Sequence, residues 1–186
     1  MAHTQLYRKA NVYIATISSM NKIIVTSVNQ NLARAISLLD AIDSTVYQNS
    51  SVAPYYSSIG SHLRHCLDFF DCIVNGLDNN QIDLTARKRD ERIAMDRTAA
   101  KSKIYELQQT FTSYLDTDTN YILHVTDDLG TGKAEVSYTL ESILAYANSH
   151  ATHHYAIIGM LLYQLNVEVE IPGFGYNPST PKTKKA

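Results

Sequence analysis

Two histidines one helical turn apart are the residues of this sequence best placed to do chemistry. His150 and His154 lie in residues 139–165, TLESILAYANSHATHHYAIIGMLLYQL, on an apolar stripe with steps of three and four residues. Side chains four residues apart share one face of a helix, so both imidazoles can bind a single metal ion. A lone core histidine is usually a hydrogen-bonded packing residue, but two on one stripe favour a metal. Without partners, each buried ring would cost roughly 1–3 kcal/mol.

A third imidazole is expected from a second helix. In residues 54–77 the apolar stripe includes His62, and His65 lies at its flank. Three imidazoles suit Zn or Ni, with Fe, Mn or Co as alternatives, and leave open positions for water or substrate. We therefore predict a metal site formed by His62, His150 and His154. Metal binding is expected to weaken at acid pH, because the rings must be neutral to bind.

Missing motifs argue against several other kinds of site. The segment His150-Ala151-Thr152-His153-His154 has the spacing of the zinc-peptidase helix, but Ala151 stands where those enzymes need a glutamate base. The sequence has no Glu-x-x-His pair, which argues against a di-iron carboxylate centre. It also has no glycine-rich phosphate loop and no nucleophile elbow. The histidines are therefore the candidate site.

Long helices are predicted to carry these histidines. Apolar residues at steps of three and four predict helices over residues 21–47, 54–77, 90–115 and 139–165. Polar residues before Pro54 mark the first break, and a polar linker over residues 81–90 marks the second. The first dozen or more residues have no clear period and are expected to be irregular. The predicted fold class is all-α, a four-helix bundle, in which metal sites form between facing helices.

A small β-hairpin is predicted before the last helix. Residues 119–138 alternate apolar and polar residues on both sides of a glycine-containing turn at 129–132, which is typical of two paired strands. His124 lies within this hairpin, and we assign it no role. Proline and glycine after the last helix predict an irregular tail over residues 166–186, with Phe174 and Tyr176 packed on the bundle.

Length and composition limit the class of protein. With 186 residues and 45% apolar content, the chain is expected to form a single domain over 1–186, with its core at about 20–165. The net charge of −2 and basic residues that are scattered, apart from Arg87-Lys88-Arg89, argue against nucleic-acid binding. No window approaches eighteen consecutive apolar residues, so we expect a soluble, cytoplasmic protein that does not bind membranes. Cys66 and Cys72 are expected to be reduced thiols.

Two segments resemble a known family. SIGSHLRHCLDFF and SHATHHYAIIGMLL are similar to the histidine segments of the DinB/YfiT-like superfamily of metal-binding four-helix bundles. The resemblance implies an up-down-down-up bundle, often dimeric, that binds a divalent metal such as Zn or Ni. It maps the family's ligands onto His62, His150 and His154, with His65 as the alternative to His62. Family members include transferases and isomerases that use low-molecular-weight thiols such as bacillithiol or mycothiol. Relatives commonly have His-x-Gly-Gln after the last ligand, whereas this chain continues from His154 with Tyr-Ala-Ile-Ile, which indicates a divergent branch.

Two functional hypotheses follow. In the first, the protein is a metal-dependent enzyme whose cation activates water or a thiol for transfer or hydrolysis on a small-molecule substrate. Tyr146, Asp68 and Arg64 are then candidate supporting or substrate-binding groups. In the second, it is a non-catalytic binding or dimerisation module with a vestigial metal site. The protein is expected to be a homodimer.

Overall fold

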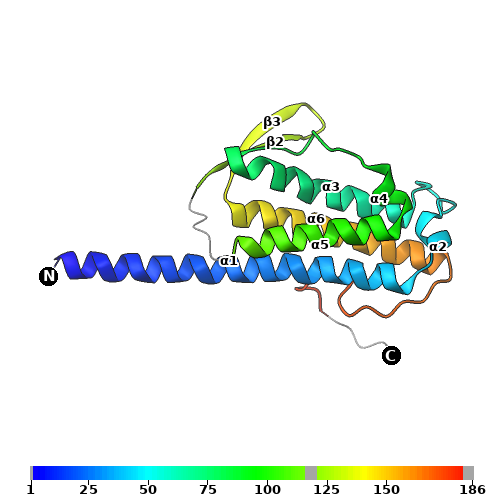
Figure 1. The fold of residues 1–186 in the computed structure, drawn as a ribbon, viewed down its shortest axis with the longest axis horizontal. Coiled ribbons are helices and arrows are strands. Elements are labelled where there is room, and N and C mark those ends of the chain that lie inside the picture. The colour runs from blue at the N-terminus through cyan, green and yellow to red at the C-terminus, as the bar shows by residue number, and fades with distance from the viewer. Residues whose placement is uncertain (1, 116–120, 182–186) are drawn as a thin grey trace.

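The chain forms a bundle of long helices with a small sheet beside α3 (Figure 1). This computed structural model describes residues 2–115 and 121–181, with side chains from Lys22 onward. The long helices are α1 (Ala2–Ala41), α3 (Ile59–Gly76), α5 (Arg97–Ser113) and α6 (Leu140–Gln164). Helices α1 and α6 run in one direction, and α3 and α5 run in the other (Figure 1). The predicted up-down-down-up bundle with a small β insertion is confirmed.

Helix α1 is longer at its start than the sequence pattern predicts. It begins at Ala2, whereas the lack of a clear period predicts irregular structure in the first dozen or more residues. Residues 2–41 contain no proline or glycine, so the backbone chemistry does not interrupt the helix. The N-terminal part of α1 runs beyond the ends of the other helices (Figure 1). At the other end, Asp43 accepts a hydrogen bond from the Val46 N–H and starts a separate short helix, α2 (Ser44–Gln48).

The second predicted helix starts later than expected, and the third is divided into two. Helix α3 begins at Ile59 and not at residue 54, because Ser58 is its N-cap. The third predicted helix divides into α4 (Glu91–Met95) and α5, and Asp96 ends one and caps the other. Arg97 contacts the end of α1, because its Nη1 donates to the Leu39 carbonyl at 2.9 Å and to that of Ile42. It thereby satisfies carbonyls at the end of α1.

The sheet contains the predicted hairpin and one strand that was not predicted. The hairpin is formed by β2 (Leu123–Asp128) and β3 (Lys133–Tyr138). A 3₁₀ turn (Leu77–Asn79) leads into β1 (Gln81–Asp83), which lies in the segment predicted to be a linker and pairs with β2 in parallel. Three residues are too few to give a period-two pattern. The segment that follows β1 lies beside α3, because Arg87 contacts His65 and Lys88 pairs with Asp71.

The core lies between the four long helices. Helix α1 packs against α5 and α6, and α3 packs against the same two helices. The largest fully buried side chains include Leu32, Leu38, Leu63, Phe70, Phe111 and Tyr155. The antiparallel pair α3 and α6 brings the histidines of both helices together. None of the helices in residues 2–115 and 121–181 combines the length and the apolar character needed to cross a membrane.

The tail is irregular and partly packed, as predicted, over its described residues up to 181; residues 182–186 of the predicted tail, like 119 and 120 of the predicted hairpin, lie outside the described residues. Phe174 stacks on Tyr155 with ring centroids 4.7 Å apart. Gly175 has a φ of +70°, and a Cβ there would lie 2.8 Å from the Ala156 nitrogen, so only glycine fits. Tyr176 is 64% exposed, in contrast to the prediction that it packs on the bundle.

Candidate metal centre

Four histidine rings meet where α3 and α6 pack together. His62 and His65 come from the first two turns of α3, and His150 and His154 come from successive turns of α6. The start of α3 is fixed by Ser58, whose hydroxyl accepts a hydrogen bond from the Ser61 N–H at 3.0 Å. All four rings are half-buried, so each keeps some contact with solvent. These four residues are named the histidine cluster below.

Three of these rings lie close enough to share one ion. One ring nitrogen each from His65, His150 and His154 lies within 4.8 Å of the others. The Nε2 atoms of His65 and His150 are 3.0 Å apart. Two nitrogen ligands of a tetrahedral zinc ion, each bound at 2.0–2.1 Å, lie about 3.4 Å from each other. The donor set therefore fits a divalent cation with small movements of the rings.

His62 belongs to the cluster, but both of its nitrogens have other partners. Its Nδ1 lies 3.0 Å from Nδ1 of His154, and its Nε2 lies 2.8 Å from the Ser57 hydroxyl. If neutral His62 donates from Nε2 to Ser57, its Nδ1 accepts a hydrogen bond from the Nδ1–H of His154. The Nε2 atom of His154 then carries a lone pair, and His62 orients the ring that can bind a metal. The ligand role of His62 stays a prediction.

Burial and neighbouring groups favour neutral histidines. Burial, followed by the charges of His150 and nearby arginines, lowers the pKa of His65 to about 4. Burial and the other three rings of the cluster, with His153, lower the pKa of His154 to about 3. The pKa values of His62 and His150 are also lowered, chiefly by burial. At neutral pH each ring therefore has an unprotonated nitrogen, as metal binding requires.

The α6 histidines lie at the edge of the core and not on its central stripe. The sequence stripe contains His150 and His154, but the buried residues of this part of α6 are Ala151, Tyr155 and Ile158. Because α6 packs against both α1 and α3, its buried face is broader than one stripe, and the histidines occupy the α3 side. Half-buried rings can be reached by solvent and by small solutes.

Aromatic side chains border one side of the cluster. Phe69 stacks on His150 with ring centroids 4.8 Å apart. The rings of Tyr146 and Phe69 are nearly perpendicular, with centroids 5.3 Å apart, and Tyr146 is 40% exposed. Of the three supporting groups suggested by the sequence, Tyr146 therefore lies beside the cluster. The other two, Arg64 and Asp68, form an ion pair with each other at 3.1 Å.

The guanidinium group of Arg87 lies beside His65, the second histidine of α3. Arg87, in the segment after β1, places its Nη1 atom 3.3 Å from Nδ1 of His65. Its Nε donates to the Leu84 carbonyl at 2.9 Å, which anchors the side chain. The sequence patterns did not identify Arg87, which lies outside the helices, or Ser57, which was expected inside the helix over residues 54–77 but precedes the N-cap Ser58. The basic triplet at 87–89 was a visible signal, but its position beside His65 depends on the short strand β1.

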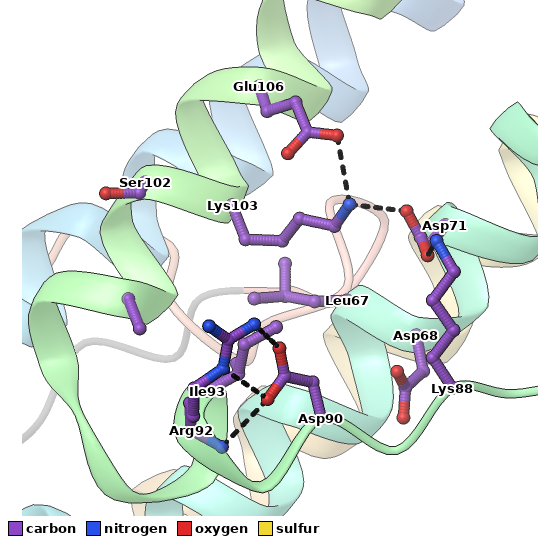
Figure 2. Close-up of a pocket in the computed structure, with 11 residues that line it drawn as sticks. Leu67, Asp68, Asp71, Lys88, Asp90, Arg92, Ile93, Ser102, Lys103 and Glu106 are labelled. Atoms are coloured by element: carbon purple, nitrogen blue, oxygen red, sulfur yellow. Dashed lines mark hydrogen bonds and ion pairs between the residues drawn. The ribbon is translucent and has the colours of Figure 1, made fainter.

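A second polar region lies on a different face of α3. Leu67 and Asp71 line a cavity of about 480 Å³ between α3 and α5 (Figure 2). Asp71 follows His62 by nine residues, about half a turn around the helix axis, so the two face away from each other. Asp90 and Arg92 form an ion pair at 2.6 Å on the rim of this cavity.

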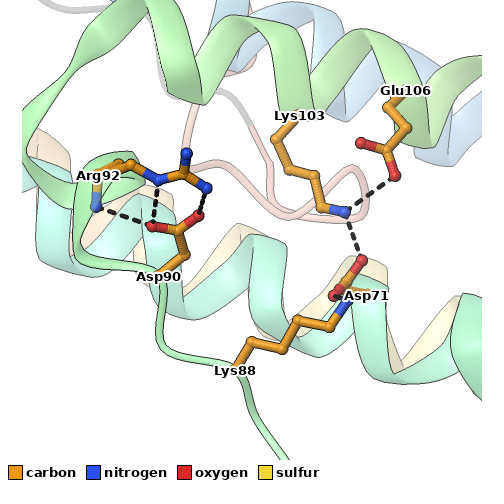
Figure 3. A network of polar contacts seen from close by, with 6 residues as sticks. All are labelled: Asp71, Lys88, Asp90, Arg92, Lys103 and Glu106. Atoms are coloured by element: carbon orange, nitrogen blue, oxygen red, sulfur yellow. Dashed lines mark hydrogen bonds and ion pairs between the residues drawn. The ribbon is translucent and has the colours of Figure 1, made fainter.

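The carboxylate of Asp71 binds two lysines (Figure 3). Nζ of Lys88 is 3.0 Å from Oδ2 of Asp71, and Lys103 pairs with the other oxygen. Lys103 also contacts Glu106 at 3.0 Å. Burial alone would raise the pKa of Asp71, but hydrogen bonds and charges from the two lysines lower it overall. These four residues are named the Asp71 network, and each of their charges has an opposite partner.

The protein is thus of the class of four-helix bundles that carry a candidate histidine metal centre, which here lies between α3 and α6. The family model of the DinB superfamily matches residues 27–158, and the chain therefore belongs to the DinB superfamily. The matched region begins within α1, ends within α6 and contains all four residues of the histidine cluster. The family inferred from the two histidine segments is thus confirmed. No curated protein matches the chain.

Proposed function

We propose that this protein is a metal-dependent enzyme whose histidine cluster holds one divalent cation. Zn and Ni are the metals that suit imidazole ligands best, with Fe, Mn or Co as alternatives. When bound, the cation would lower the pKa of a water or of a low-molecular-weight thiol and so supply a nucleophile for transfer or hydrolysis. The observation that carries the proposal is the group of three ring nitrogens within 4.8 Å of one another.

His150 and His154 are two of the proposed ligands, and the third comes from α3. The sequence predicts His62, but the closeness of the nitrogens favours His65. Both nitrogens of His62 have partners in Ser57 and His154, which suits a residue that orients a ligand. Removal of an orienting partner lowers metal affinity about 10–100-fold, whereas removal of a ligand destroys the site.

Metal content measured by elemental mass spectrometry tests this proposal. The protein should be purified without a metal-affinity step and compared with alanine variants of each cluster histidine. About one equivalent of metal is expected in the wild type, and it should be lost in His65→Ala, His150→Ala and His154→Ala. His62→Ala should still bind metal, but more weakly. His153→Ala is the matched control, because His153 lies exposed on the same turn of α6.

Two outcomes would change the proposal. Metal retained in His65→Ala and lost in His62→Ala would favour the ligand set predicted from the sequence. A wild-type protein that binds no Zn or Ni at neutral pH would exclude the enzyme. It would favour the second candidate, a non-catalytic binding or dimerisation module, which is supported by one observation: every cluster ring has a hydrogen-bond partner without a metal.

The wider setting of this function is also a proposal. We propose a single-domain, cytoplasmic homodimer that acts on a small molecule. The dimer is supported by three large apolar or aromatic side chains near the end of α6 and in the tail. Met160, Tyr163 and Tyr176 are 69%, 80% and 64% exposed. Methionine and tyrosine are enriched at protein interfaces. Light scattering on the purified protein would measure its mass directly.

A further inference from the structure

The contact between Arg87 and His65 fixes the position of a proton. A guanidinium group has only donors, so Nδ1 of His65 must accept from Nη1 of Arg87 across their 3.3 Å separation. Neutral His65 then carries its hydrogen on Nε2. That N–H points at Nε2 of His150, 3.0 Å away, which must accept it. The contact with Arg87 therefore selects one tautomer of His65.

This tautomer conflicts with metal binding at the same place. An ion shared by the facing Nε2 atoms of His65 and His150 needs a lone pair on both. The hydrogen of His65 must then move to Nδ1, where it would face the N–H of Arg87. Two donors cannot form a hydrogen bond, and the guanidinium charge would also lie close to the cation. Arg87 must therefore release His65 when a metal binds.

We propose that Arg87 gates the metal centre and that, once released by metal binding, it binds the carboxylate of a small-molecule ligand of the metal. The proposal rests on the proposed function, with His65 as a ligand. The Leu84 carbonyl continues to hold Nε of Arg87, so the group stays near the site and its Nη atoms are free. A guanidinium fork matches a carboxylate in shape and charge. An anion there would also relieve the repulsion between Arg87 and the metal.

The first test is metal affinity, measured by Zn titration against a competing chelator. Arg87→Ala should bind Zn about tenfold more tightly than the wild type, because no donor then competes for His65. Lys88→Ala is the matched control: it removes the same charge from the neighbouring residue, but Lys88 pairs with Asp71 on another face of α3. Its affinity should equal that of the wild type. Equal affinities in the two variants, or weaker binding by Arg87→Ala, would overturn the gate.

Histidine tautomers give an independent readout. Long-range ¹H–¹⁵N spectra of the metal-free protein should show His65 protonated at Nε2, and addition of Zn should move this proton to Nδ1. Protonation of His65 at Nδ1 in the metal-free wild type would contradict the selected tautomer. In Arg87→Ala the preference for Nε2 should weaken, whereas Lys88→Ala should keep it.

The carboxylate is tested with two thiols that differ in that group. In Co(II)-loaded protein, 3-mercaptopropionate and 2-mercaptoethanol can be titrated through the thiolate-to-cobalt absorption. The wild type and Lys88→Ala should prefer the carboxylate thiol about tenfold, and Arg87→Ala should lose this preference. Equal binding of both thiols by the wild type would overturn the carboxylate role alone. Absence of metal binding in every variant would instead refute the proposed function, and the gate with it.

Discussion

The histidine cluster and the Asp71 network lie on the same helix, α3, and are built on opposite principles. In the cluster, imidazole rings form hydrogen bonds with one another, and one hydrogen lies between the two nitrogens of each pair. In the network, the carboxylate of Asp71 lies between the ammonium groups of Lys88 and Lys103. A cation can replace the hydrogen between two ring nitrogens once that hydrogen moves to the other nitrogen of its ring. A ligand of the network would have to break an ion pair that is already formed.

This difference predicts that the two regions serve different ends. The cluster is suited to binding, because its polar atoms can exchange one partner for another. The network connects α3, α5 and the segment after β1, and its charges are satisfied within the protein (Figure 3). A cavity lies beside the network, but a cavity alone does not identify a site. The atoms that can accept a new partner identify it.

One substitution in each region tests this difference most directly. His154→Ala should lower Zn affinity more than 100-fold, because it removes a ligand. Asp71→Asn should leave Zn affinity within about threefold of the wild type and lower the free energy of unfolding by about 2–3 kcal/mol, since two lysines lose their charged partner. Chelator-competition titration and urea unfolding of the metal-free protein measure the two quantities. Loss of metal binding in Asp71→Asn would show that the metal centre depends on the Asp71 network.

A smaller expected difference between the two regions is in how their contributions to the free energy of unfolding depend on pH. For His65 and His154, the folded pKa values of about 4 and about 3 lie below the unfolded value of 6.5. The unfolded chain therefore binds more protons below pH 6.5, so the stabilising contribution of the neutral rings is complete above 6.5. It is lost as the pH falls towards the folded values. The lowered pKa of Asp71 preserves its contribution until the pH falls below the usual 3.8.

Urea unfolding with a chelator present, at pH 7.0 and pH 5.0, checks this prediction. The wild type should lose stability below pH 6.5, by less than about 1.4 kcal/mol per pH unit for each of the two rings, because solvent partly screens half-buried groups. The double variant His65→Gln, His154→Gln should lose clearly less, because its side chains do not titrate. Asp71→Asn should keep the wild-type pH dependence from a lower starting stability. A flat profile for the wild type would mean that the cluster is not neutral when metal-free.

The smallest expected effect lies within the network itself. Lys88 is 64% exposed at its side chain, whereas Lys103 is 16% exposed. Exposed ion pairs contribute about 0–1 kcal/mol, so Lys88→Ala should cost less than 1 kcal/mol in urea unfolding. Lys103→Met, which keeps most of the apolar stem, should cost more, because it leaves Asp71 with only the exposed lysine. Equal costs would show that burial does not set the strength of these pairs.

The amino-acid sequence alone was enough to predict the bundle, its family and a cluster of histidines. Helical periodicity is local, so the pattern around His150 and His154 predicts α6 to within one residue at each end. The breaks were less predictable, since Asp43 and Asp96 lie within segments whose apolar periodicity continues past them, and periodicity does not show which aspartate caps a helix. The strand β1 was missed because its identity comes from its partner β2 and not from its own three residues.

Which ring atoms face one another in the histidine cluster depends on how α3 and α6 pack together. Spacing along α3 places His62 and His65 on nearby faces, and a difference of a fraction of a turn decides which ring reaches His150. The nitrogen partners lie far apart in the chain: 92 residues separate His62 from His154, and 22 separate Arg87 from His65. Hydrogen bonds depend on tenths of an ångström and on direction. Periodicity fixes the side of a helix, whereas helix packing fixes those distances.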